Sequence, residues 1–192
     1  MRTGPLSGTL EAVTDQAFTT ALIAELARKT SVSWLRYTVE TRHGPRVRTH
    51  AAWHLWFEDS LCLVSGGAEQ YLPDLEDVSR VEVTMRSKES GGRLVTWVGA
   101  ASVVRPEDEV WEPLTAALVA DRLNLADLST AADEWARSSV VTRIVPTGEI
   151  LERPGELSDE AHLAPPAATP ATTRGPLPKV LHRRARRRPK LS

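Results

Sequence analysis

The chain has 192 residues, which suffices for one ordinary domain and its core. Apolar residues make up 41% of the chain and charged residues 26%, as in folded globular proteins. A single cysteine, Cys62, excludes an intrachain disulfide. The longest uncharged apolar run, residues 94–104, is too short to cross a bilayer as a helix. Because no signal-like pattern opens the sequence, we expect a cytoplasmic protein without a membrane span.

The net charge of −1 hides an asymmetry. Residues 153–192 contain nine Lys or Arg and three Asp or Glu, a balance of +6. The totals of 24 and 25 then leave 15 basic and 22 acidic residues in 1–152, a balance of −7. The sequence therefore predicts an acidic body with a basic tail.

The first predicted element is a helix over residues 14–29. Thr14 is a residue type that caps helices, and Phe18, Leu22 and Leu26 recur at helical spacing on one face. The apolar period then changes to two, which is typical of strands. Strands are predicted over residues 31–40, 46–57, 61–65, 81–88 and 93–104.

Two further helices and a last strand complete the predicted body. Residues 106–124 show helical spacing, and Pro113 fits only in the first turn of that helix. A short helix is predicted over residues 131–138 and a strand over residues 139–150. The strands are short and joined by tight turns. This order favours an antiparallel barrel or curled sheet with flanking helices over a βαβ fold.

The regular pattern stops near residue 153. Seven of the 13 prolines lie in residues 153–192, where Ala and Thr are also frequent. Such a segment buries too little apolar surface to offset its conformational entropy, so we expect it to be disordered. It ends in the basic run HRRARRRPK (182–190), which contains no aromatic residue to stack on bases. Nucleic-acid binding through this run is a possibility that the composition disfavours.

The stretch VSGG (64–67) follows an apolar strand directly and is the first candidate site. Gly66 and Gly67 would let the backbone approach an anion, and successive N–H groups can form an anion-binding nest. The stretch matches neither the Walker pattern nor GxGxxG. Because paired glycines are common in turns, the spacing alone favours a plain turn.

The second candidate is Arg86–Ser87–Lys88 at a strand end. Two cations and a hydroxyl could hold a phosphate, and a solvated strand end is an equally good interpretation.

The sequence predicts no metal site. His50 and His54 share a strand face, but four strand residues span about 13 Å, which is too far for one ion. Cys62 lies in an apolar strand and is expected to be a small core residue.

The order of these segments resembles the pyridoxamine 5′-phosphate oxidase-like family of flavin-binding split barrels, in particular its actinobacterial branch of FMN and F420 binders. RTHAAW (48–53), a strand ending in SGG, LPDL (72–75) and WVG (97–99) carry the resemblance, with RLN (122–124) and RIVPT (143–147) downstream. The similarity covers roughly residues 30–150. It implies a six-stranded antiparallel split β-barrel over residues 31–152, an N-terminal segment and helix over 1–30, and a tail over 153–192.

The resemblance also implies a homodimer with cofactor sites at the subunit interface. Matched by position, the cofactor-binding candidates are Arg48, Thr49, Ser65, Gly66, Gly67, Gln70, Arg86, Ser87 and Lys88. The family's loop continues with Ser and then a Lys or Arg, whereas this chain has Glu69, Gln70 and Tyr71.

Two functional hypotheses follow from these observations. The first is an oxidoreductase-class protein that binds FMN or F420, with haem as a further alternative and with an unknown substrate. No catalytic residue is predicted, because the cofactor would carry out the redox step. The second is a cofactor-free dimeric split barrel that acts as a binding module, with its basic tail contacting acidic partners.

Overall fold

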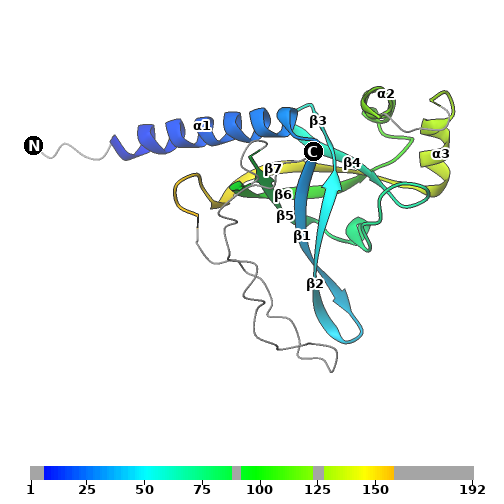
Figure 1. Ribbon diagram of the computed structural model, residues 1–192, viewed down its shortest axis with the longest axis horizontal. Helices are drawn as coiled ribbons and strands as arrows, with labels where there is room; N and C mark the ends of the chain where they lie inside the picture. Colours follow the sequence, from blue (N-terminus) through cyan, green and yellow to red (C-terminus); the bar gives the residue numbers. More distant parts are fainter. Residues whose placement is uncertain (1–6, 88–91, 123–127, 158–192) are drawn as a thin grey trace, which may run out of the picture. The chain divides into compact units, whose positions relative to one another are not determined.

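The computed structural model describes residues 7–87, 92–122 and 128–157, with side chains from residue 17 onward. The tight turn expected between the predicted strands over residues 81–88 and 93–104 lies mostly outside this part of the chain, and so do Lys88 and tail residues 158–192. Figure 1 shows the described elements. In chain order they are α1 (Ser7–Lys29), β1 (Val32–Thr41), β2 (Gly44–Trp53), β3 (Leu55–Phe57), β4 (Ser60–Ser65), the 3₁₀ turn η1 (Leu75–Asp77), β5 (Arg80–Arg86), β6 (Arg93–Val104), α2 (Trp111–Asp121), α3 (Ala131–Ser138) and β7 (Val140–Glu152).

The strands form one antiparallel sheet in the order β2-β1-β5-β6-β7-β4-β3. Hairpins connect β1 to β2, β3 to β4 and β5 to β6. The two outermost strands, β2 and β3, are consecutive in the sequence, so the sheet curls back on itself without closing. The predicted mainly β, antiparallel fold with flanking helices is therefore confirmed.

The described residues form seven strands, whereas six were predicted. The difference lies in residues 46–57, which were predicted as one strand. The structure interrupts this run at His54, whose backbone N–H donates to the Ser31 carbonyl oxygen at 3.0 Å. The His54 imidazole is buried and bonds the Ser33 hydroxyl at 2.8 Å. These two bonds keep His54 between the two strands, so β2 pairs with β1 and β3 pairs with β4.

The larger core fills the concave side of the sheet. Alternate residues of β1 (Leu35, Tyr37 and Val39) point into it, as their period of two predicts. Trp97 and Ile144 are fully buried in the same cluster. Helix α1 and the segment before η1 cover this core.

A second, smaller core lies beneath α2 and α3, which Figure 1 shows together beside β3 and β4. Cys62 and Val64 of β4 contribute one side of it. Trp111 and Leu118 of α2 and Trp135 of α3 contribute the other. Strand β4 is buried along its whole length because it has a core on each face.

Helix α1 differs from the prediction in its start and in its buried face. It begins at Ser7, so Thr14 lies inside the helix instead of capping it. Its buried residues include Ile23 and Ala27, while Phe18 is 65% exposed. The apolar residues of this segment are spread around the helix. Contact with the sheet selects the face that is buried, and the helical spacing alone could not identify it.

Gly99 in β6 is required by packing. A Cβ atom at this position would overlap the Ile144 side chain and lie 2.9 Å from the Trp97 ring. Both neighbours are fully buried, so neither can move into solvent.

We predict that Gly99→Ala lowers the free energy of unfolding by about 1–3 kcal/mol, the usual cost of overpacking a core. Urea denaturation checks this value. Ala100→Ser, at the exposed neighbouring position, is the matched control and should change stability little. Equal midpoints for the two variants would contradict the packing role of Gly99.

Candidate functional site

The loop after β4 is closed by its own contacts. Ser65 is buried at the end of β4, and Gly66 donates its N–H to the Gln70 carbonyl oxygen at 3.0 Å. Glu69 donates its N–H to the Gly66 carbonyl oxygen at 2.9 Å. Two of the backbone donors that a nest would offer to an anion are therefore already used. The turn interpretation of this stretch accounts for both bonds.

Gly67 packs against the start of β7. Its φ of +58° favours glycine, and an added Cβ would lie 2.8 Å from Ser139 Oγ and 3.0 Å from the Ser138 carbonyl oxygen. The Ser139 hydroxyl also donates to the Gly66 carbonyl oxygen at 3.3 Å. The side of Gly67 that a Cβ would occupy is thus filled by Ser138 and Ser139.

The Gln70 side chain bridges β2 and β4. Its Oε1 accepts from the Trp53 backbone N–H at 2.8 Å, and its Nε2 donates to the Trp53 carbonyl oxygen at 2.8 Å. Nε2 also donates to the Val64 carbonyl oxygen at 3.1 Å. The amide therefore pairs with Trp53 as a neighbouring strand would. Because these bonds use the amide oxygen and nitrogen, Gln70 serves as a structural tie.

Glu69 is neutralised by a cation that is distant in the sequence. Its carboxylate is 5% exposed, forms an ion pair with Arg122 at the end of α2, and accepts a hydrogen bond from Trp135 Nε1 at 3.0 Å. The Arg122 guanidinium also lies over the Trp53 ring, 4.8 Å from its centroid. Burial lowers the pKa of Arg122. This cluster joins the loop to β2, α2 and α3.

Arg48 of β2 is also paired within the chain. Its Nη2 donates to the Asp74 carboxylate at 2.6 Å, in a pair that is partly exposed. The neighbouring Tyr37 hydroxyl donates to the Pro73 carbonyl oxygen at 2.9 Å, and burial raises the pKa of Tyr37 to about 12. These contacts fix the segment before η1 against the first hairpin.

Thr49 points to the opposite face from Arg48, because successive strand residues alternate. We call this convex side of β2, β1 and β5 the outer face. Thr49 is exposed there and lies opposite Arg36, whose guanidinium holds both Glu82 carboxylate oxygens at 2.8 and 2.9 Å.

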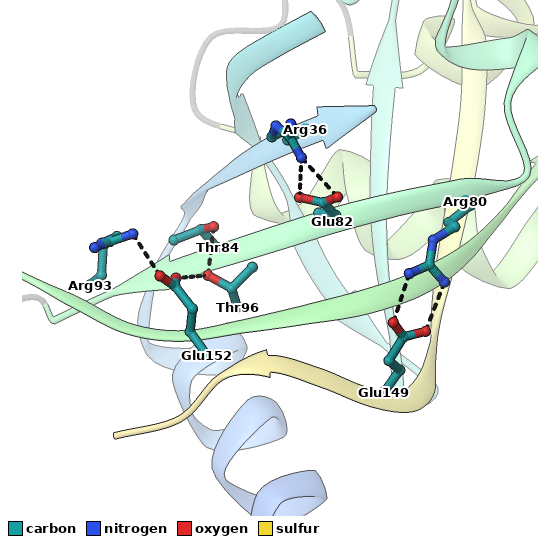
Figure 2. A network of polar contacts seen from close by, with 8 residues as sticks. All are labelled: Arg36, Arg80, Glu82, Thr84, Arg93, Thr96, Glu149 and Glu152. Carbon is teal, nitrogen blue, oxygen red and sulfur yellow. Dashed lines mark hydrogen bonds and ion pairs between the residues drawn. The ribbon is translucent and has the colours of Figure 1, made fainter. Parts of the chain in front are cut away.

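The outer face continues into the polar network shown in Figure 2. The Arg80 guanidinium donates two hydrogen bonds of 2.8 Å to the Glu149 carboxylate. Glu152 accepts from Arg93 at 2.8 Å and from the Thr96 hydroxyl at 2.6 Å. These arginines tie β5 and β6 to β7. Within the described residues they are committed to carboxylates of the same chain.

Arg86 and Ser87 lie elsewhere on the outer face, beside a cavity of about 460 Å³. Trp34, which is 40% exposed, and Ala51 form its apolar part, and Lys29 is a second cation at its rim. Lys29 also pairs with Glu25 at 2.6 Å. The lining residues are Lys29, Thr30, Ser31, Val32, Trp34, Ala51, Arg86 and Ser87. An aromatic side chain next to two cations suits a flat ligand that carries an anionic group.

The structure therefore separates the residues that the sequence grouped. Ser65, Gly66, Gly67 and Gln70 build a closed turn, and Arg48 binds Asp74. Thr49, Arg86 and Ser87 share the outer face, although Thr49 does not line the cavity. Lys88 lies outside the described residues.

Sequence reasoning missed three residues of importance here. The sequence marks Trp34 only as a residue of a predicted strand, whereas its place opposite Ala51 and Thr84 puts it on the outer face. Lys29 was assigned only to the predicted helix. The approach of Arg122 to Glu69 was unforeseeable from spacing, because the two lie 53 positions apart and meet only through the packing of α2.

The described residues contain no cluster of three or more His, Cys, Asp or Glu side chains that could hold a metal ion. Cys62 is fully buried, and burial raises its pKa to about 11, so it is a core residue as predicted. No described helix has the length and apolar character needed to span a membrane.

The sequence matches no protein-family model and no curated protein. Several solved structures are similar to the chain. A putative pyridoxamine 5′-phosphate oxidase from Listeria innocua shares 24% identity at a TM-score of 0.46, covering 69% of this chain and 98% of that one. An FAD-binding protein from Mycobacterium smegmatis shares 15% at 0.44, covering 66% and 89%. The heme storage protein HutZ from Vibrio cholerae shares 18% at 0.47, covering 66% and 88%.

The Listeria innocua protein carries the name of the family that the sequence motifs resemble. With identities below 25% and TM-scores below 0.5, these structures assign neither a ligand nor an activity to this chain.

The Glu69–Arg122 pair yields a double-mutant prediction. Arg122→Met leaves the Glu69 carboxylate buried without its cation and should lower the free energy of unfolding by about 3 kcal/mol. Glu69→Gln should cost less, because Arg122 is 22% exposed and can be hydrated. The double variant should recover part of the loss in urea denaturation. Additive single effects would contradict a direct pair.

His54 yields a pH prediction. It is 1% exposed, its Nδ1 has no hydrogen-bond partner among the described residues, and burial lowers its pKa to about 4 from 6.5. Between pH 6.5 and pH 4, His54 is therefore protonated in the unfolded chain but neutral in the folded protein. Stability should fall by about 3 kcal/mol as the pH drops from 6.5 to 4. His54→Gln should remove this component from stability measured against pH; an unchanged slope would contradict it.

Proposed function

We propose that this protein binds a flavin-type cofactor in the cavity on the outer face. The observation that carries the proposal is the exposed Trp34 ring beside Arg86 and Lys29 in a cavity of about 460 Å³. The flat ring system of the cofactor would lie against the Trp34 side chain, and the cations at the rim of the cavity would hold the cofactor's phosphate. FMN is the first candidate and F420 the second, because both combine a flat ring system with phosphate.

The cofactor, when bound, would supply hydride chemistry, which makes the protein an oxidoreductase of unknown substrate in this proposal. The chain's own residues would bind and orient it. Trp34 and Ala51 would exclude water from one ring face, and Arg86 with Ser87 would hold the anionic end. The Gly66–Gly67 turn takes no part in this proposal, because the Gly66 N–H is already bonded and Gly67 packs against Ser138 and Ser139.

A homodimer belongs to the same proposal. Val32, Trp34 and Val47 are 49%, 40% and 50% exposed on one sheet face, which is costly for apolar side chains in water. The cavity is open on this side, so a second copy covering the outer face would enclose the ligand.

The second hypothesis, a binding module without a cofactor, is favoured by one observation. The Glu69 carboxylate and the closed turn occupy the place where the resemblance puts a phosphate loop. In this case the exposed outer face would serve the dimer alone, and the basic tail would contact acidic partners.

Titration of the full chain with FMN, F420 and riboflavin tests the proposal. We expect micromolar binding of FMN, seen as quenching of flavin fluorescence, and at least tenfold weaker binding for Arg86→Gln. Riboflavin lacks the phosphate, so its affinity should be insensitive to Arg86→Gln and lost in Trp34→Ala. Sedimentation of the same samples reports the oligomeric state.

Arg42→Gln, an exposed arginine in the β1–β2 turn, is the matched control and should bind FMN like the unmodified protein. Absence of binding for all three ligands would reject the cofactor proposal and leave the binding module. An equal loss for Arg86→Gln and Arg42→Gln would mean that net charge, and not this cavity, controls binding.

A further inference from the structure

Strand β2 is an edge strand, and its outer backbone edge carries the inference. It pairs with β1 on one side and stands at the end of the sheet on the other. In an antiparallel pair, alternate residues direct their N–H and C=O groups toward the partner, and the residues between them direct these groups away from it. Which residues of β2 point away can be established from two contacts.

Trp53 fixes the alternation. Both its N–H and its carbonyl oxygen bond the Gln70 amide at 2.8 Å, so its backbone groups point away from β1. Residues of the same parity, Ala51, Thr49 and Val47, must point the same way. Pro45, which has no N–H to donate, has this parity too, as expected for an edge position.

Ala51, Thr49 and Val47 thus present three donors and three acceptors along about 13 Å of strand. No backbone partner for them occurs among the residues that the structure describes. All three are exposed, and Val47 is exposed to 50%. Gln70 already completes the edge at Trp53, so an added strand would continue the pairing that its amide begins.

The charge around this edge selects the partner. Residues 42–50 contain Arg42, Arg46 and Arg48 with two histidines and no Asp or Glu, in a body whose balance is −7. Arg46 is exposed, whereas Arg48 forms an ion pair with Asp74. A second copy of β2 pairing antiparallel would place basic side chains opposite one another, which is unfavourable. Carboxylates opposite Arg46 and His50 would be favourable.

We propose that the outer edge of β2 binds an extended acidic polypeptide segment by strand addition. Its alternate residues would be acidic, beside Arg46 and His50, and the residues between them small or β-branched, beside Val47, Thr49 and Ala51. Main-chain hydrogen bonds would supply the affinity and these side chains the selectivity. The hydrogen-bonding groups of the edge lie in the plane of the sheet, whereas the cofactor cavity opens on the outer face, and Ala51 is the residue that the two sites share.

Amide hydrogen exchange of the full chain tests the free edge. The N–H groups of Val47, Thr49 and Ala51 should exchange fast, whereas those of Arg46, Arg48 and His50, which face β1, should be protected. Adding an acetylated, amidated peptide of about seven residues that alternates Glu and Val should slow the first set at least tenfold. Fast exchange that no such peptide slows, or equal protection of both sets in the free protein, would overturn the proposal.

Variants and control ligands test the chemistry. Thr49→Pro removes one outward N–H that β1 does not use, and should weaken the peptide at least tenfold. Arg46→Glu, an exposed substitution that leaves the backbone intact, should weaken the Glu-Val peptide and favour a Lys-Val one. The same peptide methylated on alternate backbone nitrogens should fail to bind. A single-stranded oligonucleotide is the control for a surface that binds phosphate through Arg46. Tighter binding of the oligonucleotide than of the peptide, without protection of the three amides, would overturn the proposal.

Discussion

The Gln70 amide holds the two ends of the curled sheet together, and much of the structure depends on it. A sheet whose outermost strands are consecutive in the sequence must curl, yet β2 and β4 form no backbone ladder with each other. One side chain bonds both Trp53 and Val64 in place of that ladder. Because a partly buried amide left unpaired is unfavourable, these bonds also fix the path of residues 66–70. The glycine turn is thereby part of the framework that joins β2 to β4.

The Glu69–Arg122 pair carries this constraint outward. Glu69 is next to Gln70, so its position is fixed by the same turn, and its buried charge requires a partner. Arg122 meets it from the end of α2, Trp135 donates from α3, and Trp53 lies under the guanidinium. The two helices are therefore attached to the sheet by a polar contact as well as by the apolar core beneath them. A residue that would repel a phosphate in the resembled loop serves here to anchor the helices.

The outer face shows how one sheet surface can be divided by chemistry. Near β5, β6 and β7, arginines and carboxylates of the same chain satisfy one another, as Figure 2 shows. Exposed ion pairs of this kind add little to stability, because solvent screens them, so they keep the face hydrated more than they stabilise it. Around Trp34 of β1 and its partner Ala51 of β2 the face is instead apolar, with Trp34 40% exposed. Only the second region is suited to contact a ligand or another protein surface.

The sequence by itself determined the strand periods, the burial of Cys62 and the mainly β antiparallel fold, because these follow from local alternation. It could not determine the break at His54, the buried face of α1 or the start of that helix. These depend on which surfaces meet, as does the ion pair between Glu69 and Arg122. The glycine turn is the clearest case. Its residues allowed an anion nest or a plain turn, and the packing of Ser138 and Ser139 against it, which only the tertiary structure provides, favours the turn.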